Sequence, residues 1–153
     1  MNKYLILLLL SFLIMSACGK DEISTYDEPF VHINFNKQEN LNIRSNRKDV
    51  VSYYVYLSSK PLTEDLYVDY SLIKGDGLTE GVDYKILTTE NPLHFPTGIY
   101  QRPIQIQWLE RSVDPTMDNT LTIKLDSNNL SISTGLPGPS HNQSKLMFKK
   151  VNN

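Results

Sequence analysis

The sequence predicts an all-β protein, an immunoglobulin-like antiparallel β-sandwich of seven to eight strands. Three observations lead to this fold class. Hydrophobic residues recur with a period of two from residue 30 onward, turn formers separate these runs, and no segment after residue 17 shows a sustained period of 3.6. Each run would bury one face and expose the other, as antiparallel strands do. Several short strands at this spacing are typical of a sandwich.

The expected strands follow one another along the chain, with turn formers at 58–61, 75–77, 96–98 and 126–129. Two short runs, 84–87 and 93–95, are expected to form strands between the longer ones. The longer runs are defined by their inward-facing residues: Val31, Ile33 and Phe35; Val51, Tyr53, Val55 and Leu57; Leu66, Val68, Tyr70 and Leu72; Ile104, Ile106 and Trp108; Leu121, Ile123 and Leu125; Leu146 and Phe148.

The N-terminal segment has the three parts of a secretory signal: basic Lys3, an apolar run over 4–15, and a small pair at 16–17. The apolar run is shorter than the about 20 residues of a permanent membrane span. Cys18, the only cysteine, follows at once, and Met-Ser-Ala-Cys resembles the bacterial lipobox. An ordinary signal peptide is the alternative, but a lone cysteine in an exported protein has no disulfide partner. The resemblance implies that Cys18 is lipidated with palmitate-type chains and holds the mature protein at a membrane.

The residues after Cys18 suggest where in the cell envelope the protein is located. Lys20, Asp21 and Glu22 resemble the short signal that sends Bacteroidetes lipoproteins to the outer face of the outer membrane. A solvated, charged tether is the alternative interpretation of the same residues. We therefore expect three parts: a signal peptide at 1–17, a lipidated tether at 18–29 and a β-sandwich domain at 30–153. The expected location is the outer membrane, lipid-anchored and exposed at the cell surface.

Composition and motifs argue against two classes of function. The formal net charge is −2, and it becomes −3 when Lys3 is removed with the signal, so a basic surface for nucleic acid is not expected. The histidines His32, His94 and His141 have no metal-ligand spacing, and no Gly-x-Ser-x-Gly motif is present. The carboxylate pair at 64–65 lies in an expected loop without an apolar pocket around it. We expect a protein that is not an enzyme and that needs no cofactor.

One string in the middle of the chain resembles the Calx-beta family and related lipoproteins of Bacteroidetes. It consists of Gly-Val-Asp-Tyr at 81–84 followed by Leu-x-Phe-x-x-Gly at 93–98, and the resemblance extends over roughly 51–125. The Gly-Leu-Pro-Gly-Pro segment at 135–139 is similar to the closing segment of small Bacteroidetes lipoproteins. Independently of any family, Gly81 allows a backbone conformation closed to other residues, and Asp83 can accept hydrogen bonds from nearby amides. A structural corner is therefore expected at 81–84.

The same resemblance implies a calcium site, because some Calx-beta domains bind calcium through clustered carboxylates at one end of the sandwich. The matching stretch here carries Glu110, Asp114 and Asp118. These acids are separated, and Arg111 lies among them, whereas calcium prefers several oxygen ligands close together. A solvated loop is the alternative interpretation of this stretch.

Tyrosines offer a second candidate site. Tyr54 and Tyr56 alternate with the inward residues of their strand, and Tyr67 points outward from the next, so one interpretation is a platform of the three for stacking sugars. Consecutive strands of a Greek-key sandwich often belong to different sheets, which would separate Tyr67 from the pair. Tyrosine is also common on strands simply because it covers a pleated surface. Trp108 continues an inward stripe and is expected in the core.

The expected function is that of an outer-membrane surface lipoprotein with a non-catalytic interaction module. The module would bind a glycan or dock on an outer-membrane protein of a polysaccharide-uptake complex. The alternative is a calcium-dependent adhesive or structural domain.

Overall fold

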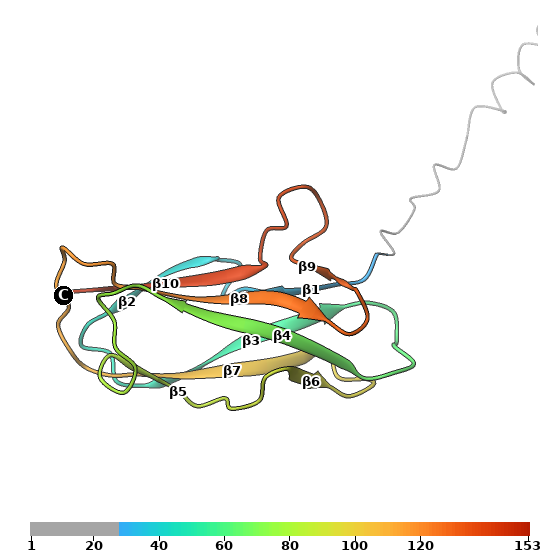
Figure 1. The fold of residues 1–153 in the computed structure, drawn as a ribbon, viewed down its shortest axis with the longest axis horizontal. Helices are drawn as coiled ribbons and strands as arrows, with labels where there is room; N and C mark the ends of the chain where they lie inside the picture. Colours follow the sequence, from blue (N-terminus) through green and yellow to red (C-terminus); the bar gives the residue numbers. More distant parts are fainter. Residues whose placement is uncertain (1–27) are drawn as a thin grey trace, which may run out of the picture.

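The computed structural model describes residues 28–153, so the expected signal peptide and the site residues Cys18, Lys20, Asp21 and Glu22 lie outside the described residues. The described chain is all-β, as predicted (Figure 1). No helix in this part of the chain is long and apolar enough to cross a membrane. The strands are β1 (Phe30–Ile33), β2 (Asn40–Arg44), β3 (Val50–Ser58), β4 (Leu66–Lys74), β5 (Tyr84–Ile86), β6 (Leu93–Phe95), β7 (Gln101–Trp108), β8 (Thr120–Asn128), β9 (Ser133–Thr134) and β10 (Lys145–Val151).

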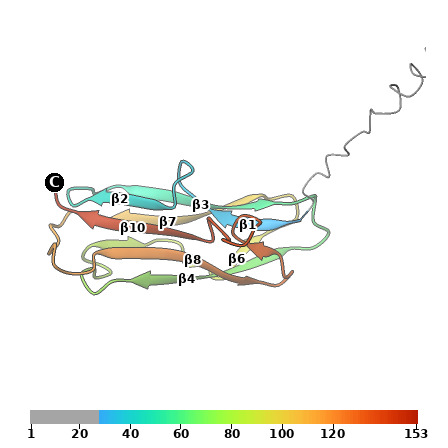
Figure 2. The same cartoon turned by 90° about the horizontal axis from the view of Figure 1, so that it is seen from above.

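These strands form two five-stranded sheets that lie face to face as a sandwich (Figure 2). The first sheet has the order β5-β7-β3-β1-β9, and the second has the order β2-β10-β8-β4-β6. Two pairs, β1 with β9 and β10 with β2, are parallel, and the other pairs are antiparallel. Consecutive β3 and β4 therefore belong to different sheets, which determines where their outward side chains lie.

The predicted inward stripes form the core between the sheets, with one exception. Leu72 was expected to be buried, but 38% of it is exposed. The reason lies in the pairing of β4: its outer neighbour β6 covers only Leu66–Val68, so the second half of β4 is a sheet edge. Leu72 thus lies in the part of β4 that has a neighbour on one side only, the strand β8.

The structure contains ten strands in its described part, and the expected count of seven to eight is corrected accordingly. The two strands missed are β2 and β9. Of the five residues of β2 only Ile43 is fully buried, so its hydrophobic pattern is too weak to detect, and β9 has only two residues. Pairing with β10 and β1, and not hydrophobic periodicity, makes these segments strands.

An aromatic cluster occupies one part of the core, as expected for Trp108. The indole Nε1 of Trp108 donates a hydrogen bond of 2.9 Å to the hydroxyl oxygen of Tyr53. Phe148 packs on both rings, with centroid distances of 4.5 Å to Tyr53 and 5.4 Å to Trp108. Burial raises the pKa of the Tyr53 hydroxyl, so this group stays neutral and the buried indole N–H keeps its acceptor.

Candidate functional site

The outer surface of the first sheet carries four aromatic side chains, which we call the aromatic face: Phe30, His32, Tyr54 and Tyr56. On β1, Val31 and Ile33 point into the core, so Phe30 and His32 point outward. The antiparallel register places His32 directly opposite Tyr56 on β3, and the two rings stack with centroids 5.3 Å apart. Phe30 lies 5.4 Å from His32, and Tyr54 lies 6.2 Å from Tyr56. The four rings form one continuous surface across two strands.

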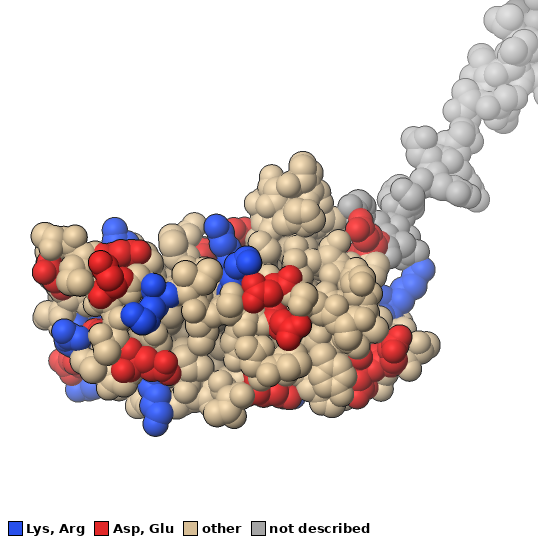
Figure 3. Space-filling view, viewed as in Figure 1, with Lys and Arg blue, Asp and Glu red and all other residues tan. Residues whose placement is uncertain are grey.

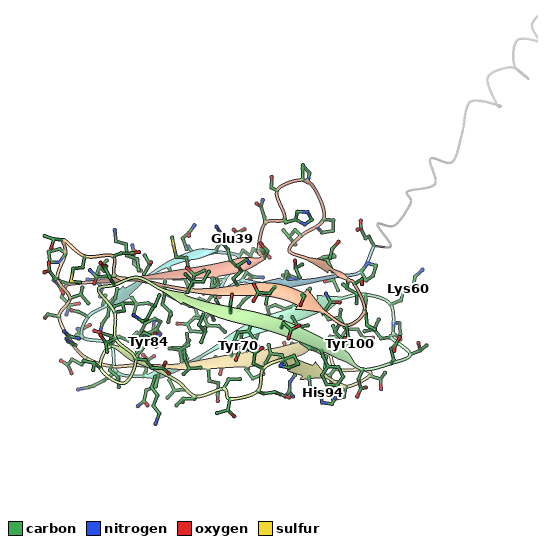
Figure 4. The ribbon with its side chains drawn as sticks, viewed as in Figure 1. Glu39, Lys60, Tyr70, Tyr84, His94 and Tyr100 are labelled. Atoms are coloured by element: carbon green, nitrogen blue, oxygen red, sulfur yellow. The ribbon has the colours of Figure 1, made fainter. Side chains whose placement is uncertain are left out.

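A shallow, open groove of about 460 Å³ runs beside these rings. Tyr56 is opposite Gln101 of β7 as well as His32, so a row of an imidazole, a phenol and an amide crosses three strands at the groove. Tyr100, labelled in Figure 4, precedes β7 and is a further aromatic residue of the lining. The groove is lined by His32, Asn34, Lys37, Tyr56, Leu57, Ser58, Tyr100 and Gln101. Its surface thus combines flat aromatic rings with amide, hydroxyl and amine groups.

His32 is neutral in this setting. Burial lowers the pKa of its imidazole below the ordinary 6.5, because the charged form loses hydration. Its Nδ1 is buried and has no hydrogen-bond partner among residues 28–153. The ring therefore acts at neutral pH as an uncharged stacking group in line with Tyr56.

The expected platform of three tyrosines is corrected by this geometry. Tyr54 and Tyr56 lie together on the first sheet, but Tyr67 is on β4 in the second sheet. Tyr67 stacks on His94, with centroids 4.7 Å apart and planes within 6°. His94 Nε2 lies 2.7 Å from the Asp65 carboxylate, and this bond, with one from the Thr97 amide, lowers the pKa of Asp65.

Sequence reasoning missed Phe30, His32 and Gln101 as members of the site. The alternation along β1 would have indicated that Phe30 and His32 point outward. Their place beside Tyr56 and Gln101 follows only from the order β7-β3-β1, which the sequence does not state.

The 81–84 corner lies toward the other end of the sandwich from Tyr100, as the positions of Tyr84 and Tyr100 show (Figure 4). The predicted corner is confirmed: Gly81 has a φ of 81°, and the Thr79 amide donates to Asp83 Oδ2 at 2.9 Å. The structure adds a buried ion pair, because Lys150 Nζ lies 3.1 Å from Asp83 Oδ1 with both side chains fully buried. Arg111 Nη1 pairs with Asp83 Oδ2 at 3.0 Å. This cluster is structural, since it joins the corner to the last strand.

The three acids suggested as a calcium site each have a partner of their own. Glu110 pairs with Lys48 at 3.3 Å. Asp114 accepts hydrogen bonds from the backbone and hydroxyl of Thr116, and Asp118 accepts from Thr120 in the same way. Within residues 28–153, no three His, Cys, Asp or Glu side chains form a group that could hold a metal ion. The structure therefore does not bring Glu110, Asp114 and Asp118 together as ligands.

Calcium is accordingly expected to leave the stability of the protein unchanged. Adding about 1 mM calcium should not shift the Tm, because a ligand stabilises the fold only if it binds the folded state. Calorimetric titration and thermal unfolding with and without the ion would check this. A saturable heat, together with a higher Tm that Asp114→Asn removes, would contradict it.

Charge on the second sheet is mixed. In the view of Figure 3, which presents this sheet, basic and acidic side chains are interspersed over the surface. No broad basic area is visible on this side, which agrees with the low net charge of the whole chain.

The two sheets and their core define the class of fold, a Calx-beta-like β-sandwich. The crystal structure of CBD12 from CALX1.2 is similar with a TM-score of 0.57 at 13% sequence identity, over 80% of this chain and 44% of that one. A two-domain protein of unknown function from Bacteroides fragilis NCTC 9343 (BF3416) is similar with a TM-score of 0.43 at 15% identity, over 83% of this chain and 46% of that one. This chain thus spans less than half the length of either. No protein-family model and no curated protein matches the sequence.

Proposed function

We propose that this protein is a lipid-anchored lipoprotein of a bacterial outer membrane, and that its sandwich binds a glycan on the aromatic face without cleaving it. The stacked row of His32 and Tyr56 beside an open groove is the observation that carries the binding part of the proposal. The anchoring part rests on the sequence at 1–22.

The composition of the groove suits a sugar. A pyranose ring presents C–H groups on its faces, which pack on aromatic rings, and hydroxyl groups at its edge, which need hydrogen-bond partners. Tyrosine supplies both an apolar ring and a hydroxyl. The amides of Asn34 and Gln101 and the hydroxyl of Ser58 lie around the rings and can pair with sugar hydroxyls. Small-ligand sites are mostly apolar and use a few precisely placed polar groups to fix the orientation of the ligand.

The lining of the groove also supports binding without hydrolysis. Most glycoside hydrolases use two carboxyl groups on either side of the scissile bond, about 5 to 9.5 Å apart. None of the eight residues that line the groove is an aspartate or a glutamate. A sugar held at Tyr56 would lie beside amides, hydroxyls and an amine, which can bind it but supply no acid and nucleophile pair.

The expected effect of Tyr56→Ala is a loss of glycan affinity of about tenfold or more, because a central aromatic side chain commonly contributes about 2 kcal/mol or more to binding. His32→Ala should act in the same direction. Retention on affinity gels, or binding on a glycan array, would measure the effect. Tyr67→Ala is the matched control, since it removes an exposed tyrosine from the other sheet and should leave affinity unchanged.

Two outcomes would overturn the proposed binding. One is that the wild-type protein is retained by no glycan. The other is that Tyr56→Ala and Tyr67→Ala weaken retention equally, which would indicate that the aromatic face is not the binding surface.

A further inference from the structure

We propose that the glycan bound at this groove is acidic, and that its anionic substituent pairs with the amine of Lys37. This inference rests on the proposed glycan-binding function and names the class of ligand. It follows from the charge of the groove and from the unusual place of Lys37 in the chain.

The charge of the groove differs in sign from that of the protein. Lys37 is its only lysine or arginine, and aspartate and glutamate are absent from its lining. No ion pair joins Lys37 to any residue between 28 and 153. The chain as a whole carries a formal charge of −2, so a cationic groove does not simply reflect composition. A lysine in the lining of this groove, without an ion pair among the described residues, is complementary to a sugar that carries a negative group.

The backbone at Lys37 is one that glycine would adopt more easily. Phe35 and Gln38 exchange two backbone hydrogen bonds of 2.9 and 3.1 Å around the two-residue turn Asn36-Lys37. Both turn residues have positive φ, 51° at Asn36 and 64° at Lys37, which defines a type I′ turn. Asparagine followed by glycine is the preferred pair for such a turn. Here a lysine occupies the second position, where its Cβ strains the turn.

Neighbouring segments hold this turn in place. The Asn34 carboxamide accepts a hydrogen bond from the Lys37 amide at 3.1 Å and donates one to Gln143 Oε1 at 3.1 Å. The Gln143 carbonyl in turn accepts from the Ile33 amide at 2.8 Å, and the Gln143 amide donates to Glu39 Oε1 at 2.9 Å. Gln143 itself has a φ of 61°.

These contacts therefore hold the Asn36-Lys37 turn at the groove, although its backbone is strained at Lys37. Strain that surrounding contacts stabilise is characteristic of functional positions. The turn alone does not favour Lys37, and within residues 28–153 this lysine of the groove lining forms no ion pair. A ligand that needs a positive charge there explains both observations.

The test uses the full-length protein in detergent and three acidic polysaccharides: polygalacturonate, alginate and hyaluronan. Each is compared with its carboxyl-reduced, neutral form. We expect the wild-type protein to bind at least one acidic polymer about tenfold more tightly than the reduced polymer, with affinity falling as salt rises. Lys37→Gly should lose that preference while its Tm stays equal or rises, because glycine relieves the turn. Lys37→Gln should lose the preference as well.

Lys48→Gln is the control, because Lys48 pairs with Glu110 away from the groove and should matter little for binding. The inference is overturned if reduced and acidic polymers bind equally, if no acidic polymer binds, or if both Lys37 variants bind as the wild type does. These results would leave glycan binding itself in place provided that Tyr56→Ala still weakens retention on some neutral glycan and Tyr67→Ala does not. A loss of acidic-polymer binding only in variants with a lowered Tm would also count against it.

Discussion

Asp83→Asn is expected to lower the free energy of unfolding by about 3 to 5 kcal/mol, the usual effect of removing one partner from a buried ion pair. The substitution keeps the shape of the side chain but removes its charge. The Lys150 ammonium would then remain fully buried beside neutral acceptors, which are the new carboxamide and the backbone carbonyl oxygens of residues 83 and 109, the latter two at 3.4 and 2.9 Å. Unfolding in urea, with the midpoint and slope compared with those of the wild type, measures the effect.

Lys150→Met is expected to cost less than Asp83→Asn. The carboxylate would still pair with Arg111, which is half exposed, and would still accept the Thr79 amide. The double variant Asp83→Asn/Lys150→Met should be more stable than Asp83→Asn alone, because it no longer buries an unpaired charge. Asp65→Asn serves as a control at a solvent-accessible carboxylate that is hydrogen-bonded to His94, and it should have a small effect. An Asp83→Asn protein within about 1 kcal/mol of the wild type would show that the pair does not matter in this way.

Cys18→Ser is expected to abolish acylation and to remove the protein from the outer-membrane fraction. The serine hydroxyl cannot form the thioether that carries the diacyl group. Each buried CH₂ contributes about 0.8 kcal/mol to membrane binding, so several chains anchor durably, whereas one gives only reversible binding. Incorporation of labelled palmitate and fractionation of the envelope would follow the two effects separately.

Replacing Lys20, Asp21 and Glu22 together by alanine is the matched comparison. This variant should keep its palmitate label but lose exposure at the cell surface, as measured by protease accessibility of intact cells. If Cys18→Ser still carries palmitate, or still reaches the outer membrane in the wild-type amount, the lipoprotein proposal fails.

The prediction of the fold rested mainly on the alternation of hydrophobic and polar residues along the strands. Stripes such as Ile104, Ile106 and Trp108 became core because a period of two leaves each strand with one apolar face, which only a second sheet can bury. The pattern failed where pairing and not burial makes the strand, as in Asn40–Arg44 and Ser133–Thr134. It also failed at Leu72, whose exposure depends on how far β6 extends along β4.

Only some residues of the candidate site could be predicted from the sequence. Tyr54 and Tyr56 could be paired, because residues two apart on one strand share a face. Their neighbours His32 and Gln101 could not be identified, because they come from strands whose order was not known. The same limit applies to Asp83: a role in the corner could be predicted, but Lys150 comes from the last strand and is 67 residues away in sequence.

The amino-acid sequence by itself determined the all-β fold class, the inward stripes and the turn at Gly81, because each depends on residues within one strand or one turn. The tertiary structure alone decided the separation of Tyr67 from Tyr56, the aromatic face and the buried partner of Asp83. Local patterns constrain which side of a strand a residue occupies, whereas the order of strands in a sheet is set by packing over the whole domain. Sites assembled across strands therefore appear only when that order is known.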